Sequence, residues 1–297
     1  MTGRPGVLAV GRLYCDLIFT GLPRLPSMGT EVFAGGLGLY PGGGAVITAA
    51  HLAELGRPAA LSAIVPAPPF DAAMMAAIEA ASIDVGLSAR AEPGADPQLT
   101  VALADAGDRA FVTRRVGPAA PPLSAAELLG QGFGHLHIGE LATLVERPEL
   151  LALAREAGLT VSLDCGWDDG LEASAARSLI PAVDVFLPNA AEVALLENLG
   201  VPGPWAPLTA IKCGADGARA EVDGHVITAP TRAVPVVDTT GAGDAFNAGF
   251  LDAWLDGGPV AACLAAGNAK GAEAVQRAGG FGRPAMAPNG QHRVLAP

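Results

Sequence analysis

The sequence predicts an α/β protein with a doubly wound, mostly parallel β-sheet flanked by helices, and a small β-sheet lid. Three observations support this. Short apolar runs of strand length alternate with longer Ala- and Leu-rich segments of helical period, the alternation recurs along the chain, and two segments of period-two alternation interrupt it. Because 51% of the 297 residues are hydrophobic, the chain can form a sizeable core. We expect one domain over residues 1–297.

The individual elements follow the order of repeated βαβ units. Apolar runs without polar interruption are typical of strands buried on both faces. Helices are indicated by apolar residues at helical spacing, and the first of them stops at Gly56. The predicted strands are 7–10, 60–65, 136–138, 160–164, 183–187 and 209–212. The predicted helices are 45–55, 71–81, 148–157, 190–199, 260–277 and one that begins at Ala242.

Two segments do not fit the βαβ rhythm. Residues 30–40 alternate with period two around glycines, and residues 98–105 with 109–115 form a predicted β-hairpin whose turn is 106–108. We assign both to a small sheet that covers the site, with the lid formed by about residues 12–40 and 97–116. The Pro- and Gly-rich stretches elsewhere are too short to link independent domains.

Charge and cysteine spacing narrow the function classes. Eighteen basic against 30 acidic residues give a net charge of -12, which argues against binding to nucleic acid or to an anionic membrane. The four cysteines lie far apart without a nearby histidine cluster, so we expect neither a zinc site nor a disulfide framework. No apolar run is long enough for a membrane span or a signal peptide. We therefore expect a cytoplasmic protein whose partners are small molecules.

The most informative run is residues 238–250, DTTGAGDAFNAGF. An extended stretch precedes it, and apolar residues at helical spacing follow, so Gly241, Ala242 and Gly243 open a helix. Free N–H groups and the helix macrodipole favour an anion such as a phosphate there. Asp244, in the first turn, could orient a hydroxyl nucleophile and accept its proton. The alternative is that Thr240 caps the helix and Asp244 only occupies its first turn.

The segment from Asp238 to Phe246 resembles the C-terminal signature of the ribokinase-like carbohydrate kinases, the PfkB family, and the resemblance extends over nearly the whole chain. It implies Mg²⁺ and ATP, with ATP as phosphoryl donor and a substrate hydroxyl as acceptor. It places Asp244 on the catalytic base and the backbone of Gly241, Ala242 and Gly243 on the anion hole.

On the substrate side, the resemblance carries over to Asp16 and to the glycines Gly42, Gly43 and Gly44. Asp16 follows the first strand, where the family has a carboxylate that binds substrate hydroxyls, although an aspartate at a strand end is also a common turn residue. The three glycines directly precede a helix and match a motif at which sugar hydroxyls meet the backbone. A flexible turn is the competing interpretation.

On the nucleotide side, Asn189 and Glu192 match a motif that organises Mg²⁺ through water, which suits a cation that prefers oxygen ligands. The same pair fits a helix capping box, and both roles are compatible. The resemblance assigns the nucleotide to a loop after a strand and to one helical residue: Lys212, Gly214, Asp216, Gly217 and Asn268. It also suggests a monovalent cation such as K⁺ near Asp238, Thr240 and Gly279–Gly280.

Two departures from the family pattern concern the substrate. Ile47 stands where sugar kinases of the family commonly have an asparagine, and isoleucine makes no hydrogen bond, so Thr48 or a lid residue would replace that contact. Asp164 keeps only the aspartate of a longer motif and is expected near the substrate. Arg12 and Arg109 could bind an anionic substrate. Exposed arginines on a lid are more often solubilising, so a neutral sugar is favoured.

The predicted function is ATP-dependent phosphorylation of a hydroxyl on a small carbohydrate, by a protein that we expect to be a homodimer. A nucleoside kinase of the same superfamily would share these motifs and would differ by an aromatic or apolar slot for a base, which Phe33 or Phe111 could supply. A nucleotide- or metabolite-binding regulator without turnover is a further alternative, against which the retained Asp244 argues. A dinucleotide oxidoreductase is excluded, because the first strand is followed by Gly11-Arg12-Leu13-Tyr14 in place of a Gly-x-Gly-x-x-Gly motif.

Overall fold

Apolar strands form an eight-stranded sheet in the order β14-β13-β12-β11-β10-β9-β1-β4 in the computed structural model, which describes residues 3–104 and 109–281. Neighbours from β12 to β4 pair in parallel, and β13 and β14 extend that edge as an antiparallel hairpin. The strands are β1 (Gly6–Val10), β4 (Ala59–Ser62), β9 (Phe133–Ile138), β10 (Thr160–Leu163), β11 (Val185–Phe186), β12 (Leu208–Lys212), β13 (Ala218–Val222) and β14 (His225–Ala229).

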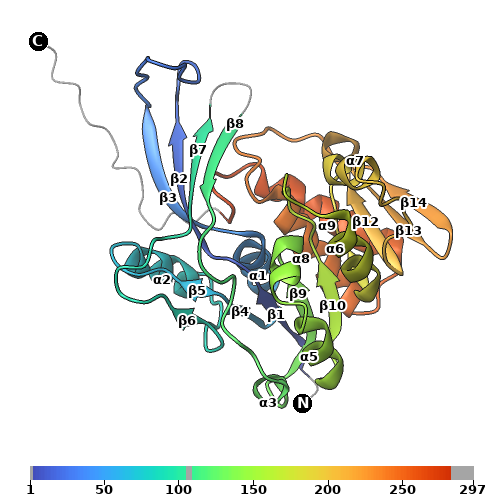
Figure 1. Cartoon of the computed structure of the whole chain (residues 1–297). Coiled ribbons are helices and arrows are strands. Elements are labelled where there is room, and N and C mark those ends of the chain that lie inside the picture. Colours follow the sequence, from blue (N-terminus) through green and yellow to red (C-terminus); the bar gives the residue numbers. More distant parts are fainter. Residues whose placement is uncertain (1–2, 105–108, 282–297) are drawn as a thin grey trace, which may run out of the picture.

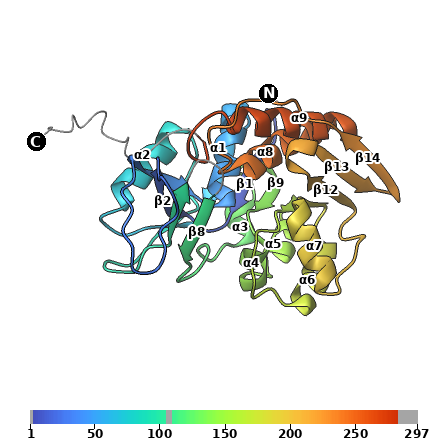
Figure 2. The same ribbon diagram turned by 90° about the horizontal axis from the view of Figure 1, so that it is seen from above.

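Helices cover both faces of this sheet (Figure 2). One face carries α1 (Gly44–Glu54), α2 (Asp71–Ala80), α8 (Ala242–Leu255) and α9 (Val260–Ala274), and the other carries α4 (Leu141–Glu146), α5 (Leu150–Glu156), α6 (Ala173–Leu179) and α7 (Ala190–Asn198). The side chains of β1 alternate between the two cores, Val7 and Ala9 on the α1 side and Leu8 and Val10 on the α5 side. A short helix, α3 (Ala125–Leu128), and the 3-10 turns Ile180–Ala182 and Gly214–Asp216 complete the helical elements described.

A second sheet of four strands, in the order β3-β2-β7-β8, projects from the main body (Figure 1). Its strands are β2 (Tyr14–Thr20), β3 (Gly36–Gly42), β7 (Leu99–Ala104) and β8 (Arg109–Arg114), and a two-stranded sheet joins β5 (Ile64–Val65) to β6 (Ala89–Arg90). The hairpin expected over 98–115 is confirmed as the antiparallel pair β7 and β8, while its predicted turn, 106–108, lies outside the described residues. The eight-stranded sheet with helices on both faces, together with the separate four-stranded sheet, confirms the predicted fold class.

Two strand boundaries differ from prediction. The strand expected over 30–40 begins only at Gly36, because Thr30 closes a local turn with Ser27 and Phe33 is 79% exposed without strand pairing. The strand expected over 60–65 is interrupted after Ser62. The hydroxyl of Ser88 accepts from the amide of Ala63 at 3.2 Å and donates to the carbonyl of Leu61, so the backbone is satisfied where the chain passes into β5.

Arg12, between β1 and β2, ties the small sheet to the main body. Its buried guanidinium donates to Gln98 Oε1 at 2.7 Å and to the carbonyl of Gly117 at 2.8 Å, and it pairs with Glu146 at the end of α4. Protein acceptors therefore engage its Nη1 and Nη2 groups, and its contact with an anionic substrate stays a prediction. Arg109 opens β8, but its side chain lies outside the described residues.

Within the described ranges, no helix combines the length and apolar character needed to cross a membrane.

Candidate active site

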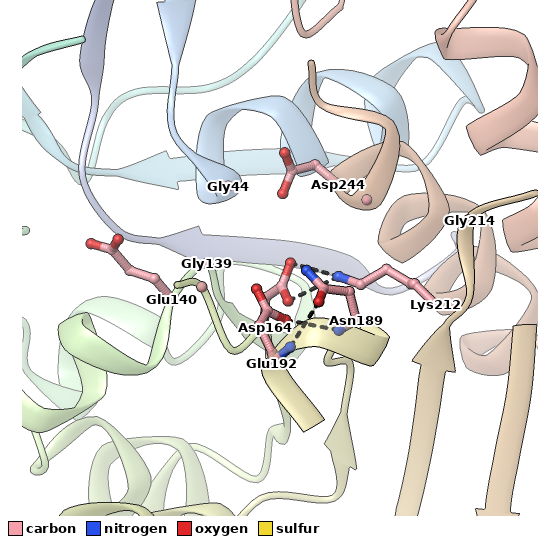
Figure 3. Close-up of a pocket in the computed structure, with 11 residues that line it drawn as sticks. Gly44, Gly139, Glu140, Asp164, Asn189, Glu192, Lys212, Gly214 and Asp244 are labelled. Atoms are coloured by element: carbon pink, nitrogen blue, oxygen red, sulfur yellow. Dashed lines mark hydrogen bonds and ion pairs between the residues drawn. The ribbon is translucent and has the colours of Figure 1, made fainter. Parts of the chain in front are cut away.

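A cavity of about 400 Å³ lies where the carboxyl ends of the parallel strands meet the N-terminus of α8 (Figure 3). Ligands bind at this edge in open parallel sheets, because the loops after the strands diverge there. The lining residues follow successive strands: Gly139 and Glu140 follow β9, Asp164 follows β10, and Asn189 comes shortly after β11. The remaining lining residues are Gly44, Gly166, Glu192, Lys212, Gly214, Gly243 and Asp244.

Asp244 projects into this cavity from the first turn of α8. Gly241 is the N-cap with φ of 73°, a left-handed conformation that glycine adopts without strain. Gly44 faces Asp244, since a Cβ built on Gly44 would lie 3.0 Å from Asp244 Oδ1 and 2.5 Å from the carbonyl oxygen of Gly139. The sequence therefore uses glycine at 44 to leave space beside the carboxylate.

The environment of Asp244 raises the pKa of its carboxyl to about 7. Burial is the largest cause, followed by repulsion from Asp164, while the positive charge of Lys212 opposes the shift. Repulsion from Glu192 and Asp16 adds to it. A carboxyl that exchanges its proton near neutral pH is suited to general base catalysis.

Lys212, at the end of β12, is held by Asp164, as Figure 3 shows, and by Asn247. Its Nζ lies 2.9 and 3.0 Å from the two oxygens of Asp164 and 3.2 Å from Asn247 Oδ1. Asn247 Nδ2 donates to Asp164 Oδ2 at 2.6 Å, and the amide of Cys165 donates to Oδ1. Burial lowers the pKa of Lys212, but the charges of Asp164 and Glu192 outweigh it and the net shift is upward.

These contacts revise the expected role of Asp164. The residue lines the cavity, but both of its oxygens are occupied by protein donors, so it holds the ammonium group of Lys212 where a sugar contact was expected. Asn247, which completes the arrangement, was not identified from the sequence. The signal that could have found it is its spacing: Asn247 is three residues after Asp244 and so lies on the same face of α8.

Asn189 and Glu192 form the capping box of α7. Asn189 Oδ1 accepts from the amide of Glu192 at 2.9 Å, and Glu192 Oε2 accepts from the amide of Asn189 at 2.8 Å. Both side chains also line the cavity, so capping leaves them within reach of a ligand there. Burial, with repulsion from Asp164 as the next cause, raises the pKa of Glu192 to about 7. A nearby cation would stabilise the ionised form of such a carboxyl.

Asp16 in β2 and Gly42 at the end of β3 belong to the small sheet and lie outside the lining of the Asp244 cavity. A Cβ on Gly42 would lie only 2.0 Å from Asp16 Oδ2, so the carboxyl rests directly on the Gly42 backbone. Burial raises the pKa of Asp16 to about 7, opposed by a hydrogen bond with Thr100. Gly43 has φ of 105°, and a Cβ there would lie 2.2 Å from the carbonyl oxygen of Arg12, so only glycine fits.

Ile47 and Thr48 do not reach the cavity. Thr48 is fully buried, and its hydroxyl donates to the backbone carbonyl of Asp244 at 3.4 Å, so it joins α1 to α8. The expectation that Thr48 replaces a lost sugar contact is therefore wrong, because its only visible partner is backbone inside the helix interface. Ile47 is 3% exposed and packs against Gly280 and Gly241.

A second cavity of about 570 Å³ adjoins the first and shares Lys212, Gly214 and Gly243 with it. Gly217 and Asn268 also line it, and much of its wall is apolar. Its apolar lining includes Val234, Val236, Phe246, Ala272 and Val275. Asn268 donates to the carbonyl of Ala229 at 2.8 Å, which fixes its orientation. Of the five residues assigned to the nucleotide, Asp216 is the one that does not line this cavity, and it is exposed.

Asp238 connects the segment before α8 with the loop after α9. Its Oδ1 accepts from the amide of Thr240 at 2.8 Å, and its Oδ2 accepts from the amide of Gly279 at 2.9 Å. The residues that the sequence grouped around a monovalent cation therefore lie together. Among the residues that the structure describes, no group of three or more His, Cys, Asp or Glu side chains could hold a metal.

Gly139 and Glu140 are site residues that the sequence reasoning missed. A Cβ on Gly139 would lie 2.3 Å from the amide nitrogen of Ala45, so glycine permits close contact between this loop and α1. Glu140 Oε1 lies 3.5 Å from Arg12 Nε, and burial raises the pKa of its carboxyl despite that charge. Both directly follow the strand that the sequence predicted over 136–138, which was the available signal.

Comparison with known proteins gives one consistent result. The profile of the pfkB family of carbohydrate kinases matches residues 7–283. The ATP-dependent ribose-1-phosphate kinase of Halopiger xanaduensis is 31% identical in an alignment of 288 residues that covers 94% of each chain.

Solved structures share the fold. The nucleoside kinase of Methanocaldococcus jannaschii, an archaeal member of the ribokinase family, superimposes with a TM-score of 0.77 at 20% identity, over 94% of this chain and 95% of that chain. The ribokinase of Arabidopsis thaliana complexed with ribose and ATP gives 0.74 at 20% identity, over 94% and 95%. With the family profile spanning nearly the whole chain, the protein belongs to the pfkB family of carbohydrate kinases and is a phosphotransferase that acts on a sugar hydroxyl.

Proposed function

We propose that the protein transfers the γ-phosphoryl group of ATP to a hydroxyl of a small, neutral carbohydrate, with Asp244 as catalytic base. The observation that carries this proposal is the position of Asp244. Its carboxyl lies in the first turn of α8, beside the backbone amides of Gly241 and Gly243, and faces the space that Gly44 leaves open. The amide of Ala242 donates to the carbonyl of Thr239 at 3.2 Å. A hydroxyl in that space would be close both to a base and to an anion-binding helix terminus.

Asp244 orients the acceptor hydroxyl and takes its proton late in the reaction. An alcohol has a pKa of roughly 16, far above that of the carboxyl, so the proton moves only as the new P–O bond forms. The acceleration comes mainly from alignment and from stabilising charge on the transferring group. The helix-terminal amides and the ammonium group of Lys212 supply that stabilisation, because Lys212 lines both cavities.

The adjoining apolar cavity would take the base and ribose of ATP, with Gly214, Gly217 and Asn268 in its wall. Lys212 and Gly243, which line both cavities, would then direct the phosphates toward Asp244. Asp216, which points to solvent, has no part in this arrangement.

Asn189 and Glu192 fit a magnesium ion bound mainly by the nucleotide phosphates. A buried carboxyl with a raised pKa gains from a nearby divalent cation, and oxygen donors acting through water suit Mg²⁺. Bound there, Mg²⁺ would neutralise charge on the transferring phosphoryl group. We also propose that K⁺ binds near Asp238 and Thr240, beside the loop that Gly279 begins.

The charges around the acceptor space favour a neutral substrate. Glu140 and Asp244 line it with carboxyls, and Asp16 lies close enough to raise the pKa of Asp244. Arg12 is engaged by protein acceptors, and Arg115 pairs with Asp168 at 2.8 Å. A sugar phosphate, the substrate named for the Halopiger xanaduensis relative, is the alternative. A nucleoside is less favoured, because neither Phe33 nor Phe111 lines the cavity of Asp244.

A coupled assay of ADP release against neutral pentoses and hexoses, ribose 1-phosphate, sugar acids and nucleosides tests the proposal. We expect kcat/KM to be highest for a neutral sugar. Preference for ribose 1-phosphate would refute the neutral substrate but would leave the proposed kinase activity standing. ATP and sugar binding without ADP release from any acceptor would instead favour a regulator.

The small sheet is proposed as a lid that excludes water during transfer, and as the surface through which two chains form a homodimer. Water would otherwise compete as phosphoryl acceptor. The exposed face of this sheet carries apolar side chains, of which Val112 is 68% and Leu37 is 38% exposed. Sedimentation velocity would give the oligomeric state.

A further inference from the structure

The loop that begins at Gly279 lies between the small sheet, helix α1 and the start of α8. Gly279 packs against the ring of Tyr40 in β3, where a Cβ would lie 2.4 Å from Tyr40 Cδ1. Gly280 packs against Ile47, and a Cβ on Gly241 would lie 2.7 Å from the Cα of Gly280. The loop is therefore in direct contact with the N-cap of α8.

His51 in α1 also contacts this loop. The ring is only 2% exposed, and its Nε2 donates to the carbonyl of Gly280 at 3.0 Å. Its Nδ1 lies 3.2 Å from Glu54 Oε2, and Lys270 Nζ donates to the same oxygen at 2.7 Å. Burial lowers the pKa of His51, so the neutral ring has a single N–H, which it donates to Gly280. This bond ties the Gly280 carbonyl to α1.

We propose that His51 is a positioning residue for phosphoryl transfer, which holds the Gly279–Gly280 loop against Gly241 and so fixes the anion-binding amides of α8. This inference rests on the proposed function. Two further contacts connect the loop to the same segment: Asp238 accepts from the amide of Gly279 through one oxygen and from that of Thr240 through the other. The loop is thus joined to the α8 N-terminus by packing and by hydrogen bonds.

His51 should affect the chemical step and leave nucleotide binding unchanged. The residue lines neither cavity, so it cannot contact ATP or the acceptor directly. The amides at the start of α8 bind charge that develops in the transition state, and misplacing them removes an interaction made mainly there. Such a loss lowers kcat and leaves KM for ATP nearly constant.

The test compares His51→Ala, which removes the donor, with His51→Gln, which keeps an N–H donor on a side chain of similar reach. We expect His51→Ala to lower kcat about tenfold, the effect of losing one buried hydrogen bond, with KM for ATP within about twofold of wild type. His51→Gln should recover most of kcat. His135→Gln is the matched control, because His135 is equally buried but bonds to Thr160 and Ser162 in the main sheet.

Hydrogen exchange of the same variants without ligand separates this inference from the proposed function. In His51→Ala, amides of residues 276–281 and 239–243 should exchange faster than in wild type, and those of His135→Gln should not. Unchanged exchange in these two segments, or equal losses of kcat in all three variants, would overturn the positioning role. If wild type phosphorylates no acceptor, the proposed function fails, and the exchange pattern alone decides whether His51 holds the loop.

Discussion

Replacing Asp244 by asparagine should lower kcat by orders of magnitude and, at alkaline pH, make the unliganded protein more stable. Asparagine has nearly the same shape and no charge. As general base, Asp244 is expected to contribute on the order of 10² to 10⁴ in kcat. The gain in stability follows from the raised pKa of the carboxyl in the folded protein, which means that folding opposes its ionisation.

The magnitude follows from the two pKa values. The carboxyl has an ordinary pKa of 3.8 and a folded-state pKa of about 7. Below pH 3.8 it is protonated in both states and costs nothing. As the pH rises from 3.8 through 7, the unfolded chain ionises first, and the folded state loses up to about 4 kcal/mol at about 1.36 kcal/mol per pH unit.

Thermal unfolding at pH 8 and pH 5, without nucleotide or magnesium, measures the effect. At roughly 2 °C per kcal/mol for a chain of this size, Asp244→Asn should raise Tm by up to about 8 °C at pH 8 and by less at pH 5. Asp256→Asn is the control at the other end of α8. Hydrogen bonds from Arg4 and then Arg57 hold the pKa of Asp256 below its usual range, so its loss should not raise Tm. A Tm unchanged by Asp244→Asn at pH 8 would refute the reasoning.

Three further predictions follow from the same contacts. Lys212→Met should destabilise the protein by about 3 to 5 kcal/mol in urea unfolding, because it leaves Asp164 as an unpaired buried charge, and adding Asp164→Asn should restore stability but not kcat. Glu192→Gln keeps an acceptor for the α7 cap, so Tm should change little, while the Mg²⁺ concentration for half-maximal rate should rise about tenfold; an unchanged magnesium titration would remove Glu192 from the metal site. Val112→Glu on the small sheet should shift sedimentation from dimer to monomer, and a wild-type protein that sediments as a monomer would contradict the dimer proposal.

Much of the layered architecture was predictable from local patterns. A buried parallel strand such as β1 is a continuous apolar run, and α1, α2, α7 and α9 end within a few residues of their predicted limits, because burial imposes the helical and strand periods on the sequence. The edge hairpin β13–β14 was missed. Its residues are partly exposed and mixed in polarity, so no period marks them.

The candidate site divides in the same way. Residues 238–244 could be located from sequence because backbone conformation and charge at one helix terminus are local properties, set by glycines and one aspartate. The roles of side chains that meet only in the folded chain could not be predicted in this way. Asp164 is expected to contact a sugar when considered alone, and only the arrival of Lys212 and Asn247 from β12 and α8 makes it their partner.

The sequence by itself determined the fold class, the family resemblance and the helix terminus at which a phosphate would bind, since each depends on residues close together in the chain. Tertiary structure alone decided that Arg12 joins two sheets, that Thr48 faces the interior and that His51 reaches the loop at Gly280. Those assignments depend on which polar groups meet across long stretches of chain. Such pairings are fixed by packing of the whole domain, which no local pattern encodes.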